Sequence, residues 1–243
     1  EEGKQWGSFD YSQQEPRLVA HYAASVNENF SGADEFIEAY KNEAADFHQI
    51  VADMAGISRT HAKTINLGLF YGMGKAKLAR ELGISKDNAE NLLQKYHARV
   101  PFVKRLAEAV TNSSSKYGFI RTIKGRKCRF DMWEPATFGM NKAMQYEEAK
   151  AIYGNNIRRA FTYKALNRLI QGSAADQTKQ AMINCYKKGY KPLLQIHDEL
   201  CFSIDKESDI IGVREVMENA IENLKVPFKV DIALGRSWGQ AKE

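Results

Sequence analysis

The 243-residue sequence predicts an α+β fold, with strands near both ends of the chain and helices between them. An apolar strand pattern covers Trp6 to Tyr11, and a last one covers 228–234. Two further apolar arms flank the acidic pair Asp198-Glu199, as they would in a hairpin. Between these strands, apolar residues recur at helical spacing over most of the chain, which is long enough for a substantial core.

Composition excludes several classes of protein. Hydrophobic content of 44% and charged content of 27% are typical of an ordinary soluble globular protein. The net charge of +5 is compatible with a polyanionic partner without identifying one. Three cysteines without metal-ligand spacing indicate reduced thiols in an intracellular protein. No apolar run approaches the roughly 20 residues that span a bilayer, and no signal peptide opens the chain, so no membrane partner is expected.

Capping residues and prolines mark where the helices begin. Pro16 suits the first turn of a helix that follows the first strand. Ser58 and Ser85 are good N-caps, and Pro101 suits the start of a further helix. Helical patterns of apolar residues cover 34–54, 58–82, 145–172, 176–188 and 208–224.

Residues 117–130 alternate apolar and basic side chains around Gly125, which predicts a hairpin. From Lys116 to Arg129, six of fourteen residues are Lys or Arg and none is acidic. A run of charge is usually a solvated face. Beside a nucleotide site, the same hairpin would bind a phosphate backbone, which provides affinity without sequence preference.

The helix after Ser58 carries Arg59, Lys63, Leu67 and Tyr71 at intervals of four, so they form one stripe along it. Two cations in the first two turns oppose the helix dipole, at a cost of a few tenths of a kcal/mol. Beside the free backbone N–H groups of a helix N-terminus they suit a phosphate. On helix geometry alone, two solvated basic residues above an apolar core are an equally good interpretation.

The same stretch resembles motif B of the family A DNA polymerases, the bacterial DNA polymerase I group. In that motif an Arg, a Lys, an aromatic residue and Tyr-Gly follow one another at intervals of four. This sequence has Arg59, Lys63, Leu67 and Tyr71-Gly72, so Leu67 departs from the pattern. The resemblance implies a fingers helix over 58–74 that grips the triphosphate of an incoming nucleotide.

Two further stretches resemble this family in the expected order. D-Y-S-Q-Q-E-P-R, beginning at Asp10, is similar to motif A, although Gln14 and Pro16 depart from its usual form. L-L-Q-I-H-D-E-L, ending at Leu200, is similar to motif C. Taken alone, an aspartate after a strand is often a turn residue, and an acidic pair is often a polar hairpin turn. The resemblance implies instead that Asp10 and Asp198 are catalytic carboxylates that hold metal ions.

The resemblance also implies a role for each matching position. Glu199 would be an additional metal carboxylate, and Lys63 would also act in catalysis by giving a proton to the leaving pyrophosphate. Glu15 would lie under the nucleotide sugar and block a 2′-hydroxyl. The nucleotide-binding residues would be Gln13, Glu15, His48, Arg59, Lys63, Leu67 and Tyr71.

Primer–template DNA would be bound by a second set of residues. Asn167 and Gln171 lie four apart on one helical face, and the minor groove offers acceptors on every base pair. Amide caps near a helix end at Gly172 are the alternative for this pair. Tyr163 stands where the family has an arginine. The remaining DNA-binding residues would be His197 near the primer terminus and Arg121, Lys124, Arg126 and Lys127 on the hairpin.

The resemblance implies a helical fingers subdomain and an antiparallel-sheet palm that carries the carboxylates. Palm would occupy 1–30 and 131–243, with the motif C hairpin at 193–204, and fingers would occupy 31–130, with the basic hairpin at 117–130. The family's thumb, first palm segment and exonuclease domain have no counterpart. We therefore expect either a fragment or a second polypeptide that carries those parts.

The implied reaction is transfer of a nucleotide from a deoxynucleoside triphosphate to a primer 3′-hydroxyl. Two Mg²⁺ ions would be required, and Mn²⁺ would substitute. The rival interpretations are a single-subunit RNA polymerase, which Glu15 disfavours, and a non-catalytic module that binds primer–template. The expected location is the cytoplasm of a bacterial cell or phage-infected host, with an organelle left open.

Overall fold

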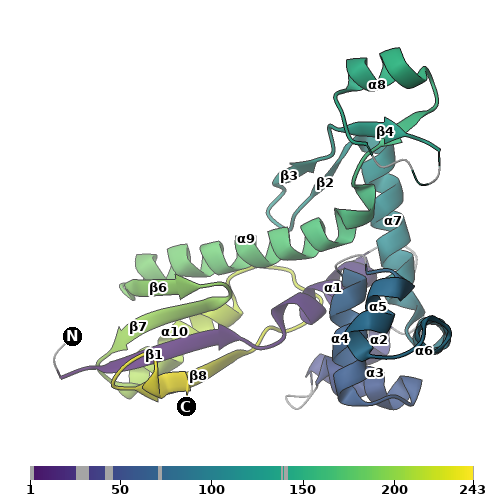
Figure 1. Ribbon diagram of the computed structural model, residues 1–243. Helices are drawn as coiled ribbons and strands as arrows, with labels where there is room; N and C mark the ends of the chain where they lie inside the picture. The colour runs from purple at the N-terminus through teal and green to yellow at the C-terminus, as the bar shows by residue number, and fades with distance from the viewer. Residues whose placement is uncertain are drawn as a thin grey trace. The chain divides into compact units, whose positions relative to one another are not determined.

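A computed structural model of the chain (Figure 1) describes residues 3–25, 33–41, 46–70, 73–137, 139 and 142–242. It confirms the predicted α+β class. The chain forms two compact units. The first unit comprises Glu1–Asn27, Ala33–Phe47 and Ser173–Glu243, and the second comprises Glu28–Gly32 and His48–Gly172.

The first unit is built on a four-stranded antiparallel sheet in the order β6-β7-β1-β8. Its strands are β1 (Gln5–Tyr11), β6 (Pro192–Ile196), β7 (Glu199–Ile204) and β8 (Val230–Gly235). Strand β1 is central, so the N-terminal strand is hydrogen-bonded on both sides by strands from the C-terminal part of the chain. The three strand regions expected from apolar patterning are therefore parts of a single sheet.

Successive side chains of β1 and of β7 point to opposite sides of the sheet, so the two faces of the sheet differ in composition. Phe9 and Phe202 lie on one face and meet edge-to-face, with their ring centroids 5.4 Å apart. Ser8 and Asp10 lie on the opposite face, as do their partners Cys201 and Glu199. The apolar face fixes the register, because a shift of one residue would exchange the two sets.

Helices α1 (Gln14–Ser25), α2 (Ala33–Lys41) and α10 (Glu207–Glu218) accompany the sheet in the first unit. The hydroxyl of Tyr11 donates to the carbonyl of Met217, which ties the end of β1 to α10. The guanidinium of Arg17 donates to the carbonyls of Ser12 and Pro227 and lies 4.3 Å from the Tyr40 ring centroid. The contacts of Arg17 hold α1 against α2 and against the segments that flank the ends of β1 and β8.

The second unit opens with five helices, in the part of it that the structure describes. They are α3 (Phe47–Ala55), α4 (Arg59–Phe70), α5 (Lys75–Leu82), α6 (Lys86–Arg99) and α7 (Pro101–Tyr117). The N-caps predicted at Ser58 and Ser85 are confirmed, since their hydroxyls accept from the backbone N–H groups of His61 and Asn88. Pro101 is the first residue of α7, as expected.

The predicted hairpin is confirmed, with β2 (Phe119–Arg121) pairing antiparallel with β3 (Lys127–Arg129). Beyond it lie β4 (Trp133–Pro135), α8 (Tyr146–Tyr153), β5 (Ile157–Arg159) and the 3₁₀ turn η1 (Thr162–Lys164). Helix α9 (Ala165–Lys187) then runs from the second unit into the first. The two units consequently divide the predicted segment 131–243 at Gly172, because β4 and β5 pair with each other and belong to the second unit.

The single helix predicted over 34–54 is wrong. Helix α2 ends at Lys41 and α3 begins at Phe47. The backbone N–H of Phe47 donates to the side-chain oxygen of Gln13 at 2.8 Å, so a residue distant in sequence caps the first turn of α3. The apolar pattern continues across this break and did not reveal it.

Three other helix boundaries also differ from expectation. The helix predicted over 145–172 is interrupted by β5, and Gly172 lies inside α9 instead of ending a helix. The motif B helix ends at Phe70, and Met73 and Gly74 separate it from α5; Tyr71 and Gly72 lie outside the described residues. Helix α10 ends at Glu218, short of residue 224.

No helix of the described chain combines the length and apolar character that crossing a membrane requires.

His21 provides a test of the packing of the first unit. Its Nδ1 accepts from the backbone N–H of Lys225 at 3.2 Å, and burial, together with the charge of Lys225, lowers the pKa of His21 to about 4. Between pH 6.5 and pH 4, His21 is therefore protonated in the unfolded chain but not in the folded chain. The free energy of unfolding consequently decreases as the pH is lowered through this range. The full shift corresponds to roughly 3 kcal/mol at pH 4. The native chain and His21→Gln can be compared by urea unfolding at several pH values. As the pH is lowered below 6.5, the unfolding free energy of the native chain should decrease more than that of the variant. Parallel curves would contradict the assignment.

Candidate active site

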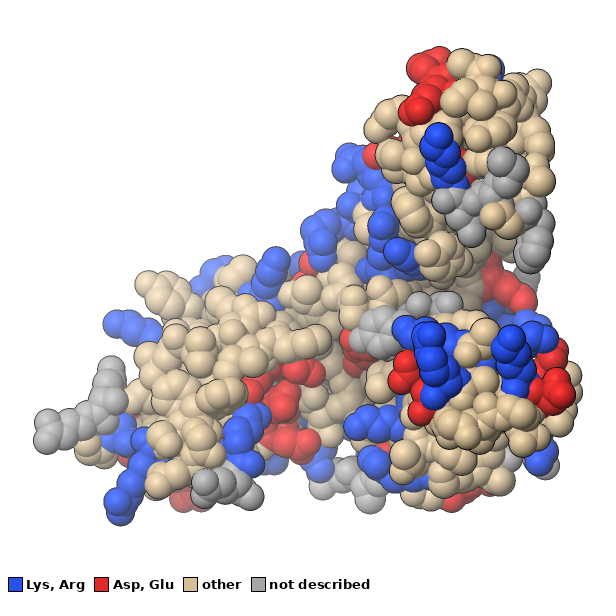
Figure 2. Space-filling model, viewed as in Figure 1, with Lys and Arg blue, Asp and Glu red and all other residues tan. Residues whose placement is uncertain are grey.

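The sheet gathers acidic residues where β1 ends. Asp10 pairs with Glu199 of β7 on one side and with Asp231 of β8 on the other. Asp198 lies in the two-residue turn between β6 and β7, in which His197 adopts a left-handed φ of 55°. Figure 2 shows acidic side chains gathered over this end of the sheet. Residues from two motifs nearly 190 positions apart thus meet within one unit, as the sequence predicted.

Asp10 and Asp198 form a close carboxylate pair. Burial raises the pKa of Asp10 to about 6, and the charge of Asp198 and a hydrogen bond with it act in the same direction. The charge of Lys242 partly offsets these effects. Both side chains stay accessible, with exposed fractions of 43% for Asp10 and 32% for Asp198. Two crowded, accessible carboxylates are a site that a cation would stabilise.

Glu199 is held in a different way from the two aspartates. It is 4% exposed, and its Oε1 accepts from the Ser8 hydroxyl, from the Cys201 thiol at 3.3 Å and from the Trp238 indole N–H at 3.2 Å. Its Oε2 lies 3.0 Å from Nζ of Lys242. Burial alone would raise the pKa of Glu199, but the hydrogen bonds from Ser8, Lys242 and Cys201 outweigh it and lower the pKa. Glu199 is therefore a fixed, charged group.

The contacts of Lys242 and Trp238 with the acidic residues were not predicted from the sequence. Both belong to the segment 236–242, which folds back on β8 and ends in the 3₁₀ turn η2 (Gln240–Lys242). Gly235 makes this close approach possible, since a Cβ there would lie 2.8 Å from the backbone nitrogen of Ala241. Nζ of Lys242 lies 3.7 Å from Oδ2 of Asp10, besides its contact with Glu199. These contacts join residues at least 39 positions apart in the sequence, so no local pattern predicts them.

The donor set fits a hard divalent cation. Mg²⁺ prefers carboxylate oxygens, with water and phosphate oxygens completing the shell, and Asp10 and Asp198 supply two accessible carboxylates. Among the residues that the structure describes, no three Asp, Glu, His or Cys side chains converge as a ligand group. The predicted third carboxylate, Glu199, is instead engaged by four neighbours.

Motif A residues after Asp10 contact neighbouring helices. Gln13 has a left-handed φ of 53°, and its side-chain oxygen accepts from Phe47. Gln14, where the family has an aliphatic residue, is buried and donates to Ala174, Gln177 and Thr178 of α9. Glu15 lies in the first turn of α1 and is partly exposed.

The basic residues of the motif B stripe are exposed. Arg59 and Lys63 lie in the first two turns of α4, which has no acidic residue in its first turn, and Leu67 one turn later is partly buried. Tyr71, the last member of the stripe, lies outside the described residues. The arrangement leaves two cations beside the N–H groups of a helix start, which is what a phosphate ligand requires.

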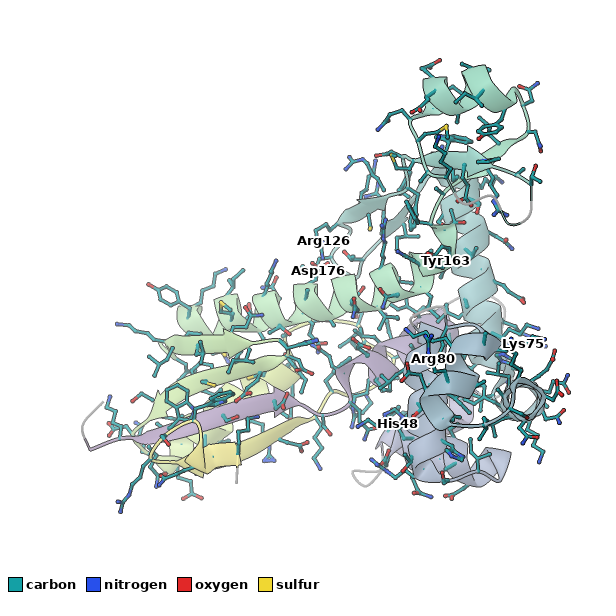
Figure 3. The ribbon with its side chains drawn as sticks, in the orientation of Figure 1. His48, Lys75, Arg80, Arg126, Tyr163 and Asp176 are labelled. Atoms are coloured by element: carbon teal, nitrogen blue, oxygen red, sulfur yellow. The ribbon has the colours of Figure 1, made fainter. Side chains whose placement is uncertain are left out.

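His48, labelled in Figure 3, is 7% exposed and belongs to a buried network of three helices. Its Nδ1 lies 3.0 Å from the amide nitrogen of Asn66 on α4. The hydroxyl of Tyr96 on α6 donates to the amide oxygen of Asn66 at 2.6 Å. Asn66, which is fully buried, therefore sets the orientation of His48 relative to α4, a role that its polar character on an apolar stripe could have indicated.

Basic side chains gather over the β2–β3 hairpin and the start of α9 (Figure 2). Arg126 (Figure 3) donates to the carbonyl of Gly172 at 2.9 Å, and a Cβ at Gly172 would lie 2.7 Å from Thr122. Gly172 is thus a packing position for the hairpin, and the alternative of amide caps at a helix end is wrong. Asn167 and the exposed Gln171 lie on α9 beside this contact in sequence.

The other predicted DNA-binding side chains are exposed. Arg121 and Lys127 both lie over the ring of Phe119, 5.4 and 4.7 Å from its centroid, and Lys124 is in the turn. Tyr163, in the 3₁₀ turn η1 and labelled in Figure 3, is 58% exposed in the place of the family arginine. The side chain of His197 is 71% exposed.

Charge crowding at Asp10 leads to a stability prediction. The pKa of Asp10 is raised in the folded chain, so ionisation of Asp10 costs more in the folded chain than in the unfolded chain. The resulting destabilisation of the metal-free fold begins near pH 4 and is complete above pH 6. The 43% exposure of Asp10 reduces the effect to about 1 kcal/mol. Asp10→Asn should therefore be more stable than the native chain at pH 7.5 in EDTA, by urea unfolding, and should lose any stabilisation by Mn²⁺. A variant that is less stable in EDTA, or equally stabilised by Mn²⁺, would contradict this account.

Comparisons with known proteins agree with the geometry. The sequence is 35% identical to a DNA-directed DNA polymerase of Pseudomonas phage M6, over 99% of this chain and 39% of that protein. It is 34% identical to DNA polymerase I of Lactococcus lactis, over 97% of this chain and 26% of that protein. The fold is similar to the POL domain of Pol1 from M. smegmatis in complex with DNA primer-template and dNTP, with a TM-score of 0.76 and 31% identity.

That structural likeness covers 100% of this chain and 41% of the Pol1 chain. The chain thus spans between about a quarter and two fifths of the length of these relatives. Residues 1–240 match DNA polymerase family A. The chain belongs to DNA polymerase family A.

Proposed function

We propose that this chain adds deoxynucleotides to a primer 3′-hydroxyl under the direction of a template. The proposal rests on the pair of accessible carboxylates, Asp10 and Asp198, which a cation would stabilise. Membership of the polymerase family and likeness to a structure with primer-template and dNTP support the choice of substrates.

Asp10 and Asp198 would hold two Mg²⁺ ions, or Mn²⁺ in their place. When bound, these ions would lower the pKa of the 3′-hydroxyl and offset the charge of the leaving pyrophosphate. Glu199 would not bind the ions directly. Its hydrogen bonds would hold β7 in place, and with it the turn that carries Asp198. Two aspartates from separate strands suffice, because Mg²⁺ takes its other ligands from phosphate and water.

The exposed cations of α4 would bind the triphosphate. Arg59 and Lys63 would neutralise its charge, and Lys63 would give a proton to the leaving pyrophosphate. His48 would support them from the network of Asn66 and Tyr96. Gln13, Glu15, Leu67 and Tyr71 would complete the nucleotide site, with Glu15 excluding a 2′-hydroxyl.

DNA would be bound through geometry and charge. Asn167 and Gln171 would hydrogen-bond in the minor groove, where acceptors are present on every base pair. Arg121, Lys124, Arg126 and Lys127 would contact the phosphate backbone, and His197 would lie near the primer terminus. Because the chain spans a fraction of its relatives' length, extension is to be measured with the chain alone and with any co-purifying polypeptide.

Removal of one aspartate tests the proposed chemistry. Asp198→Ala should lower the rate of primer extension by about 10³-fold or more, because each motif supplies a single carboxylate to the pair. Primer–template affinity should be unchanged. Asp205→Asn, in an exposed position after the same hairpin, is the matched control and should extend normally. Near-native extension by Asp198→Ala, in a preparation active with the native chain, would overturn the assignment.

Leu67 generates a prediction about chain terminators. In the family, a tyrosine hydroxyl at this position can substitute for the missing 3′-hydroxyl of a dideoxynucleotide, whereas phenylalanine cannot. Leucine also lacks a polar atom, so the native chain should discriminate against dideoxynucleotides. A buried hydrogen bond contributes roughly 1–2 kcal/mol, so Leu67→Tyr should raise dideoxynucleotide use about ten-fold in competition assays. Leu67→Phe is the control. Equal use of both substrates by the native chain would refute the prediction.

A further inference from the structure

The segment 236–242 places a single ammonium group among the carboxylates of the first unit. Ala241 is 8% exposed and anchors η2 against the sheet, while Lys242 extends toward the end of β1. Nζ of Lys242 lies 3.0 Å from Oε2 of Glu199 and 3.7 Å from Oδ2 of Asp10. Its side chain keeps an exposed fraction of 39%, so it can move without unpacking the segment.

Glu199 and Asp10 depend on the ammonium group of Lys242 to different degrees. Glu199 keeps hydrogen bonds from Ser8, Cys201 and Trp238 if the lysine is removed, so its position does not depend on the ammonium group. Asp10 is also close to Asp198, and the charge of Lys242, 3.7 Å from Oδ2 of Asp10, partly offsets the repulsion between the two aspartates. A divalent ion on the same two aspartates would lie within a few ångströms of Nζ, where like charges repel strongly.

We propose that Lys242 is a built-in counterion that competes with the divalent cation for Asp10. It keeps the metal-free carboxylates compatible with the fold and holds the affinity of the empty site for a cation low. A nucleotide that brings its own phosphate charge would shift the balance toward the metal ion. This inference rests on the proposed role of Asp10 and Asp198.

Direct measurement of Mn²⁺ binding tests the competition without relying on catalysis. Free Mn²⁺ can be counted by electron paramagnetic resonance in the absence of nucleotide and DNA. At low ionic strength, Lys242→Met should bind Mn²⁺ about ten-fold more tightly than the native chain, and added salt should reduce the difference. Lys242→Arg, which keeps the charge, should bind as the native chain does. Lys179→Met removes a positive charge from the exposed face of α9 and should also leave the affinity unchanged.

A second readout comes from thermal unfolding. In EDTA, Lys242→Met should unfold at a lower temperature than the native chain, because Asp10 and Glu199 lose their counterion, and saturating Mn²⁺ should remove the difference. Equal or weaker Mn²⁺ binding by Lys242→Met would overturn the inference and leave the proposed function standing. If neither chain binds Mn²⁺, both the inference and the proposed metal site are overturned.

Discussion

The pairing of β1 with β7 is the constraint on which the candidate site depends. It sets Asp10 opposite Glu199 and, through the turn before β7, brings Asp198 beside Asp10. The register is maintained by packing on one face, where Phe9 meets Phe202, and by hydrogen bonding on the other, where Ser8 reaches Glu199. A shift of one residue would turn Asp10 toward the apolar face, so the same contacts that stabilise the sheet position the carboxylates.

The acidic residues at this edge have opposite electrostatic environments. Burial and a neighbouring charge raise the pKa of Asp10, whereas hydrogen-bond donors lower the pKa of Glu199 in spite of its burial. The first carboxylate is accessible and gains from a cation, and the second is already satisfied by the protein. In the proposed function, the adjacent acidic residues Asp198 and Glu199 would therefore serve different purposes: the accessible Asp198 would bind the cation, and the buried Glu199 would hold the strand that follows it.

The sequence predicted what depends on local patterning and on motif. Apolar alternation identified the strands, Ser58, Ser85 and Pro101 marked helix starts, and the acidic residues were expected to meet. Features that depend on contacts between distant segments were missed. Gln13 caps the start of α3 at Phe47, within the single helix predicted over 34–54, and Gly172 lies inside α9, where the hairpin packs on it. Lys242 and Trp238 reach Glu199 only through the fold of the last segment.

We infer that Asp10 and Asp198, and not Glu199, would hold the divalent cation. Anomalous scattering from crystals soaked in Mn²⁺ locates the ion directly and needs neither nucleotide nor turnover. We expect a peak within bonding distance of carboxylate oxygens of Asp10 and Asp198. Glu199 should still be bound by Ser8 and Trp238, and Nζ of Lys242 should have moved away from Asp10. A peak coordinated by Glu199, or one at a site without Asp10, would contradict it.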